Sequence, residues 1–280
     1  MTFARNVLIV LSAGFVLLYT GALGYLYVSQ REFLFPRGTA QIRNPEQSSI
    51  YRAQDIVEPD GTRLTIWRAS PKRRGAGTFV MFHGNAASVL EFAGAGEAIH
   101  QEGFGVVLAS YRGYSGNTGS PSEAGLMADA HAILATVPKD DGPVILWGHS
   151  LGSGVAARMA SEGRASALIL ESPFTAAVDL AAVAYPYFPV RWLMKDRFDT
   201  LSLAPRIKVP VLILHGTEDQ AIPFRMSETL ARAFGRQATL VPVQDADHNP
   251  DPSELLPLVQ TWVRAHSAAI HHTEAGVPHA

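Results

Sequence analysis

The sequence predicts an α/β fold with a mostly parallel sheet, helices on both faces of that sheet, and one apolar helix at the N-terminus. Short apolar runs rich in β-branched residues alternate with longer stretches of helical period. This alternation is typical of strands joined by helices. Several of the short runs are apolar at consecutive positions, which indicates strands covered on both faces. A long segment without charged residues lies near the N-terminus.

Length and composition favour one domain with a short addition. The chain has 280 residues, and single α/β domains commonly reach about 250. It carries 23 Lys and Arg against 25 Asp and Glu, a formal net charge of −2. A nucleic-acid-binding protein usually has clustered basic residues in excess, so no nucleic-acid partner is expected. Cysteine is absent, which excludes disulfides, thiol catalysis and thiolate metal sites but does not identify the compartment.

The N-terminal segment from Val7 to Val28 contains no charged residue. About 22 helical residues at 1.5 Å each span the roughly 30 Å hydrocarbon core of a bilayer. Three tyrosines near its C-terminal end, followed by Arg31, suit the membrane–water interface. Residues 1–30 are therefore predicted to form a single-pass membrane anchor.

Two alternatives for this segment remain open. One is a cleaved signal peptide, for which Ala22-Leu23-Gly24 is a poor cleavage site, and the other is a buried core helix. The side of the membrane is not determined, because basic residues lie on both sides of the segment. They are Arg5 on one side and Arg31, Arg37 and Arg43, offset by Glu32, on the other.

The strands and one helix start can be placed from the apolar pattern. Ser120-Pro121-Ser122-Glu123 combines an N-cap serine, a first-turn proline and a capping-box glutamate, so a helix is predicted to follow Ser120 and to run through His131 and Leu134. The predicted strands cover residues 64–69, 78–82, 106–110, 144–147, 167–170, 211–214 and 239–243.

The segment Gly148-His149-Ser150-Leu151-Gly152 lies directly between an apolar strand and a run of small residues. In that context a G-x-S-x-G pattern predicts a nucleophile elbow, in which flanking glycines let the chain bend sharply and the helix pack close to the strand. Ser150 is the candidate nucleophile, and a structural glycine turn is the alternative. His149 is expected to pack or hydrogen-bond beside the elbow rather than to act as base.

A serine hydroxyl needs a base within hydrogen-bond reach and an acid that orients the base. On a fold with this elbow, the acid and then the histidine follow the serine in the sequence. His248 lies in a loop after the final predicted strand, where a base can reach across the sheet. His215 closes a strand and His266 ends the last helix, so both are expected to be structural. His248 is therefore the candidate base.

The acid is expected in the loop after the preceding strand, where the chain carries Asp219. Its neighbour Glu218 is expected to be solvated. Asp245 and Asp247 are expected to cap turns around His248.

Backbone donors for a developing oxyanion are also predicted. Phe82-His83-Gly84-Asn85-Ala86 occupies the strand-to-helix turn where this type of fold places one donor. The backbone amides of Asn85 and Leu151 are the candidates. A purely structural turn is the alternative for the His83-Gly84 pair.

These motifs resemble those of the α/β-hydrolase-domain serine hydrolases, and in particular the branch with an N-terminal membrane helix that includes protein-depalmitoylating thioesterase relatives. The resemblance implies the α/β-hydrolase fold over residues 31–266. It does not determine the substrate, because the same scaffold carries esterases, thioesterases, lipases and peptidases. It rests on 82–85, on the expected structural turn 111–116, on 148–152, 171–174 and 215–219, and on His248.

Two further segments carry predictions. Residues 172–205 leave room for only a small cap, whose apolar side chains either cover Ser150 as a flap suited to an acyl chain or pack against the sheet. Residues 267–280 are predicted to be a flexible tail. Its histidines, His271, His272 and His279, have no partner ligands at defined spacing and are expected to be solvated rather than to bind metal.

The sequence therefore predicts a membrane-anchored serine hydrolase that cleaves carboxylic ester or thioester bonds through an acyl-enzyme intermediate. Its substrate is expected to be a small-molecule or lipid-like acyl compound, with no cofactor and no metal. A peptidase on the same fold is an alternative, although such enzymes usually carry an additional large domain. A non-catalytic membrane-bound interaction protein is a second alternative, against which the combination of serine, acid, histidine and oxyanion turn argues. No protein partner can be named.

Overall fold

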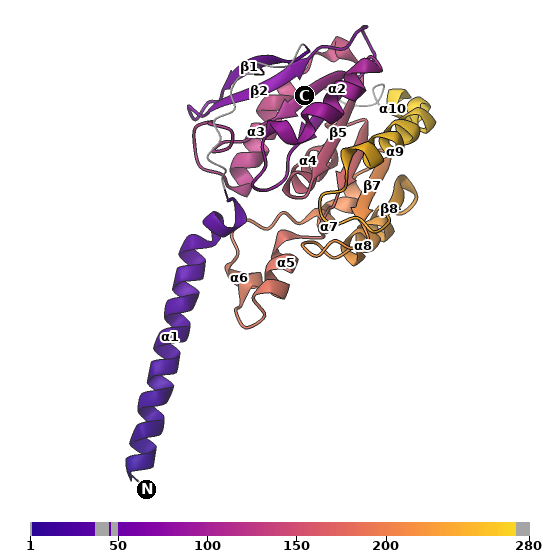
Figure 1. Ribbon diagram of the computed structural model, residues 1–280. Coiled ribbons are helices and arrows are strands. Elements are labelled where there is room, and N and C mark those ends of the chain that lie inside the picture. The colour runs from indigo at the N-terminus through magenta and orange to yellow at the C-terminus, as the bar shows by residue number, and fades with distance from the viewer. Residues whose placement is uncertain (1, 37–44, 46–49, 273–280) are drawn as a thin grey trace.

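The computed structural model describes residues 2–36, 45 and 50–272 (Figure 1). Within these residues an eight-stranded sheet has the order β1-β2-β4-β3-β5-β6-β7-β8. The first three strands of that order pair antiparallel, and the pairs from β4 to β8 are parallel. The strands are β1 (Arg52–Val57), β2 (Arg63–Ala69), β3 (Thr78–Phe82), β4 (Gly105–Ala109), β5 (Val144–His149), β6 (Ala167–Glu171), β7 (Val211–Gly216) and β8 (Ala238–Val243).

The predicted α/β-hydrolase fold with a mostly parallel sheet is confirmed, and all seven predicted strands are present with ends shifted by a few residues. β1 was not predicted. It lies at the edge of the sheet, and its residues are exposed or half-buried. An edge strand of this kind lacks the apolar run that marks a central strand.

Helices cover both faces of the sheet. Successive residues of β3 point to opposite faces, so Val80 joins one buried cluster, while Phe79 and Met81 join the other. The first cluster includes side chains of α3, α4 and α8, and the second includes side chains of α2 and α9. The bounds are α2 (Ala93–Gln101), α3 (Glu123–Ala135), α4 (Leu151–Ser161), α8 (Arg225–Phe234) and α9 (Pro252–Ala265).

The predicted start of α3 is wrong by two residues. The N-cap is Ser122, whose hydroxyl accepts a hydrogen bond from the amide of Gly125, and not Ser120. Glu123 therefore occupies the first helical position. Its carboxylate accepts from the amide of Arg197 instead of closing a capping box. Ser120 and Ser122 offer the same cap chemistry, and the tertiary contact at Arg197 was not visible in the local pattern.

Helix α1 (Thr2–Leu34) projects away from the sheet (Figure 1). Among the described residues it is the one helix whose length and composition would let it cross a membrane. None of its residues is buried, which excludes the alternative of a core helix. The boundary expected at residue 30 lies within this continuous helix.

A small cap follows β6. It contains α5 (Ala177–Ala184) and α6 (Val190–Leu193), and α7 (Thr200–Leu203) leads back to the sheet. Figure 1 shows α5 and α6 set apart from the sheet, beside the C-terminal end of α1. The cap thus lies beside the end of the apolar helix that adjoins the sheet.

The C-terminal segment begins with helix α10 (Ser267–His272), where a flexible tail was expected. Ile270 is buried in the cluster that contains α9, which explains why the chain is held there. Residues 273–280, and with them His279, lie outside the described residues.

Candidate active site

Ser150 lies at a sharp turn between β5 and α4. Its φ is 49° and its ψ is −115°, a backbone conformation that a non-glycine residue adopts only when its surroundings impose it. The surroundings are tight: a side chain on Gly152 would overlap the carbonyl of Phe82, and one on Gly148 would overlap the backbone of Gly152. Both glycines of the G-x-S-x-G pattern are therefore required by packing, as the predicted elbow implies.

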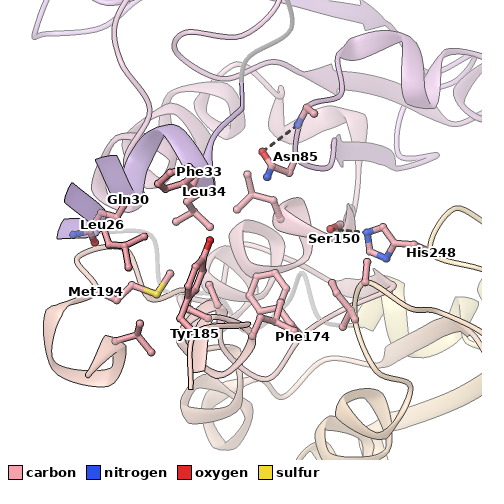
Figure 2. Close-up of a pocket in the computed structure, with 18 of the residues that line it drawn as sticks. Leu26, Gln30, Phe33, Leu34, Asn85, Ser150, Phe174, Tyr185, Met194 and His248 are labelled. Carbon is pink, nitrogen blue, oxygen red and sulfur yellow. Dashed lines mark hydrogen bonds between the residues drawn. The ribbon is translucent and has the colours of Figure 1, made fainter. Parts of the chain in front are cut away.

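The three candidate catalytic side chains meet at the carboxyl ends of β5, β7 and β8. The Ser150 hydroxyl lies 3.0 Å from Nε2 of His248. Nδ1 of the same ring lies 2.7 Å from Oδ2 of Asp219, whose side chain is fully buried. This geometry lets Nδ1–H donate to the carboxylate while Nε2 accepts the hydroxyl proton. Figure 2 shows Ser150 and His248 side by side.

The loop that carries His248 is fixed through its backbone. The His248 carbonyl accepts hydrogen bonds from the hydroxyl of Ser172 at 3.1 Å and from Nε2 of His149 at 3.2 Å. Asp247 accepts from the amide of Asn249 at 2.8 Å, which is the turn-capping role predicted for it. Because His149 is the last residue of β5 and Ser172 follows β6, the ends of two strands hold the candidate base, His248, in place.

His215 is also a member of the site, although only a structural role was predicted for it. Its Nε2 lies 3.0 Å from Oδ2 of Asp219 and 2.9 Å from the carbonyl of Ile222. Both partners are acceptors, so Nε2 carries the proton, and the hydroxyl of Ser227 lies 2.6 Å from Nδ1. The four-residue spacing between His215 and Asp219 was the available signal, but only the fold shows that the two side chains meet.

Asp219 is held as a carboxylate. Its Oδ2 accepts from His215 and His248, and its Oδ1 accepts from the amides of Ala221 and Ile222, each at 2.8 Å. Burial opposes the charge, but these hydrogen bonds outweigh burial and keep the pKa of Asp219 well below its usual range. The rival Glu218 is exposed, in line with its predicted solvation.

The two candidate oxyanion donors lie on turns that adjoin Ser150. Leu151 is the first residue of α4, and a first-turn amide has no acceptor within its own helix. On the other side, a side chain added to Gly84 would meet Nδ1 of His149 at 2.8 Å and the Ser150 Cβ at 3.4 Å, so the turn before Asn85 lies close to Ser150. Asn85 and Ser150 line one cavity.

The turn that carries Asn85 is supported from several sides. Glu91 accepts from the amide of Gly84 with both carboxylate oxygens at 3.2 Å. Tyr111 donates to the carbonyl of His83, and Tyr114 donates to the Asn85 side chain, both at 3.2 Å. The turn 111–116 therefore lies beside the site and has the structural role predicted for it.

Arg112 fastens this tyrosine turn to the rest of the domain. Its guanidinium contacts Asp129 at 2.7 Å, Asp60 at 2.9 Å and Glu58 at 3.0 Å. Asp129 is fully buried and belongs to α3, while Glu58 follows β1. A guanidinium offers several donors in one plane, which suits three carboxylates at once.

Comparison with known proteins identifies the family. A family described as alpha/beta hydrolase fold matches residues 77–199. The alpha/beta hydrolase domain-containing protein WAV2 of Arabidopsis thaliana is 30% identical over 226 residues, which cover 71% of this chain and 72% of WAV2. The chain belongs to the α/β-hydrolase family.

Other relatives of this α/β hydrolase differ in how much of their length is shared. An uncharacterized protein of Mycobacterium tuberculosis is 34% identical over 248 residues, covering 86% of this chain and 87% of that protein. Mouse ABHD12, a lysophosphatidylserine lipase, is 36% identical over 148 residues, but these cover only 46% of this chain and 37% of ABHD12. The solved structure of the Pyrococcus furiosus esterase Pf2001 matches this chain with a TM-score of 0.66 at 20% identity. The match covers 82% of this chain and 98% of the esterase chain, and it shows a likeness of fold.

The candidate site of the α/β hydrolase opens into a cavity of about 590 Å³. Ser150 and His248 lie at one end of it, and apolar side chains of the cap and of α1 form much of its wall (Figure 2). This volume lies within the range of roughly 300–1,000 Å³ that is usual for small-molecule sites. Both arrangements considered for the cap are present in part: its side chains line the cavity that contains Ser150, and Leu180 and Met194 also pack against a buried core cluster.

The buried side chain of His149 lies next to Ser150 in the chain and contacts a carboxylate. Nδ1 of His149 is 2.9 Å from Glu91, and Glu171 accepts from the Trp147 indole at 2.8 Å. Burial alone would lower the pKa of His149, but the carboxylates of Glu171 and Glu91 outweigh burial and raise it to about 9. Through Glu91 and the carbonyl of His248, His149 thus links the turn that carries Asn85 to the loop that carries His248, in agreement with its expected role beside the elbow.

Proposed function

We propose that this α/β hydrolase is a membrane-anchored serine hydrolase that cleaves carboxylic ester or thioester bonds through an acyl-enzyme intermediate. The observation that carries the proposal is the hydrogen-bonded series from Ser150 through His248 to Asp219 at the end of a mostly apolar cavity. A serine placed in this way is activated by its base and has room for an acyl group beside it.

The proposed reaction has two halves. Ser150 Oγ attacks the acyl carbon while His248 Nε2 takes the hydroxyl proton, and the amides of Asn85 and Leu151 hold the oxyanion of the tetrahedral intermediate. His248 then gives the proton to the departing alcohol or thiol, leaving the acyl group on Ser150. Water attacks this ester with His248 again as base, which releases the acid and restores the serine. Asp219 orients the ring and stabilises its protonated form.

The lining of the cavity favours an acyl compound over a peptide. Phe174, Leu180, Phe188 and Met194 contribute apolar surface to its wall, and peptide groups would lose hydrogen bonds against such a wall. One relative, mouse ABHD12, is named for its action on a lysophospholipid. A lipid-like acyl ester is therefore the proposed substrate class.

The proposal predicts covalent labelling by a fluorophosphonate probe. The full chain, incubated with the probe and digested, is expected to carry the label on the peptide that contains Ser150, because only an activated serine attacks such an electrophile at useful rates. Mass spectrometry identifies the labelled residue, with heat-denatured protein as the control. A label on a different residue, or no label on the folded chain, would contradict the assignment of Ser150.

Membrane attachment through α1 gives a second prediction. Deletion of residues 2–18 removes about half of the apolar helix but retains Tyr19, whose ring stacks on Phe188 at a centroid distance of 5.4 Å. The full chain is expected to stay in the membrane fraction after an alkaline carbonate wash, and the shortened chain to be released, because the remaining apolar stretch is too short to span a bilayer. Both should hydrolyse a short soluble ester. A full chain that is soluble without detergent would show that the prediction of a membrane anchor is wrong.

A further inference from the structure

We infer that α1 does more than anchor the protein: its C-terminal half forms one wall of the acyl-binding cavity, and the acyl chain of a membrane lipid ester lies along it. The inference rests on the proposed function, since it concerns how the proposed acyl substrate is bound. It makes the membrane helix a determinant of chain-length selectivity.

The cavity lies between two elements that are far apart in the sequence. Figure 2 shows Ser150 and His248 at one end, Leu26 and Gln30 at the other, and Tyr185 and the cap opposite α1. A chain that reaches the distant end from Ser150 therefore passes between α1 and the cap. The residues that α1 contributes are Leu23, Leu26, Tyr27, Gln30, Phe33 and Leu34.

Polar contacts hold this part of α1 against the cap. The side-chain oxygen of Gln30 accepts from the amide of Lys195 at 2.7 Å, and its nitrogen lies 3.4 Å from the carbonyl of Leu193. Arg31 forms an ion pair with Asp196 at 2.7 Å, and the Asp196 side chain is only 4% exposed. A helix that merely tethered the domain would need no such contacts at its cavity-lining turns.

Aromatic contacts extend the attachment toward the N-terminus. Tyr19 stacks on Phe188 with an interplanar angle of 2°, and its hydroxyl donates to the carbonyl of Tyr187 at 2.9 Å. Lys195 lies 4.2 Å from the centre of the Tyr27 ring. The cap thus contacts α1 from Tyr19 to Arg31, over several helical turns.

The cap presents large apolar side chains to its surroundings beside the membrane helix. Tyr187 is 85% exposed, Trp192 is 88% exposed and Val183 is 61% exposed. Aromatic residues of this kind favour the membrane–water interface, where the ring meets lipid and the polar edge meets water. With α1 in the bilayer, the α1 end of the cavity lies next to the lipid, and a lipid acyl chain can enter without crossing water.

The test measures chain-length selectivity of the full chain in lipid vesicles. The ratio of kcat/KM for p-nitrophenyl palmitate to that for the butyrate is compared between the unchanged chain and Leu26→Trp. The bulky ring would fill the end of the cavity that only a long chain reaches, so we expect the ratio to fall on the order of tenfold or more. The matched control is Val28→Trp, on the same turn but 79% exposed and outside the cavity lining, which should leave both rates unchanged.

A second substitution guards against a folding defect in the first. Leu23→Trp lies farther along α1 from the serine, so it should lower turnover of the palmitate while affecting the laurate less than Leu26→Trp does. An unchanged palmitate-to-butyrate ratio in both Leu26→Trp and Leu23→Trp would overturn the inference and leave the proposed function intact. If the unchanged chain hydrolysed neither ester and took up no fluorophosphonate at Ser150, the proposed function would fail, and the inference with it.

Discussion

Replacing Ser150 by alanine is expected to abolish ester hydrolysis, with a loss of kcat on the order of 10⁶-fold, because loss of the nucleophile removes the covalent route altogether. The substitution deletes one oxygen atom and the 3.0 Å hydrogen bond to His248. The φ of 49° at this position already accommodates a Cβ, so alanine brings no new steric cost. Steady-state turnover of a short ester by purified full chain measures the effect.

The control for this experiment is Ser161→Ala at the C-terminal end of α4, the helix that follows Ser150. Its hydroxyl donates to the carbonyl of Arg158 within α4 and lies outside the cavity lining. Turnover should be retained in this variant, and the thermal midpoints of both variants should stay close to that of the unchanged chain. Hydrolysis by Ser150→Ala at more than about one hundredth of the original rate would mean that another group carries the reaction.

The parts of the fold that could be predicted are those set by local pattern. Central strands buried on both faces must be apolar at consecutive positions, so β3, β5, β6 and β7 were readable directly. The glycines around Ser150 were readable because the strand-to-helix turn leaves no room for side chains at either position.

The supporting network of the site could not be predicted, because its contacts join distant parts of the chain. Glu91 and His149, which are in contact, are 58 positions apart in the sequence. His149 also contacts the carbonyl of His248, which is 99 positions away. Each residue alone fits a surface position or a strand end. Only the parallel order of the strands brings the ends of β3, β5 and β8, and with them these residues, to the same side of the sheet.

The contacts of α1 likewise join distant parts of the chain. Its apolar run predicts a membrane helix, and a sequence pattern that ends at residue 30 suggests that the domain begins there. The helix instead continues to Leu34, and its contacts with the cap link positions 163 to 168 apart. A hydrophobic pattern records that a segment avoids water, but not whether lipid, protein or substrate replaces the water.

Conversion of Asp219 to asparagine is expected to lower kcat/KM by at least roughly 10²-fold, and a comparable change in a serine protease costs about 10⁴-fold. Oδ1 accepts from two backbone amides, while Oδ2 accepts from His215 and His248. If the amide oxygen of asparagine keeps the backbone bonds, its NH₂ group faces both rings. Nδ1 of His248 must then accept a hydrogen bond, which places the ring proton on Nε2. A protonated Nε2 can no longer take the proton of Ser150.

This substitution should also change stability in a pH-dependent way. The depressed pKa of Asp219 means that its carboxylate stabilises the folded state above the ordinary aspartate pKa of about 3.9, and that this stabilisation is lost as pH falls toward the folded-state value. The thermal midpoint of Asp219→Asn is therefore expected to lie below that of the unchanged chain at pH 7. The difference should narrow when both are measured below about pH 4.

Three neighbouring carboxylates provide the comparison that separates the acid from its rivals. Glu218→Gln, Asp245→Asn and Asp247→Asn should each keep most of the activity, because Glu218 is exposed and Asp247 caps its own turn through an oxygen that asparagine also has. All four variants are assayed on one ester, with near-ultraviolet circular dichroism to check folding. If Asp245→Asn or Asp247→Asn lost activity while Asp219→Asn kept it, the acid would lie in the histidine loop, and the contact of 2.7 Å between His248 and Asp219 would be structural only.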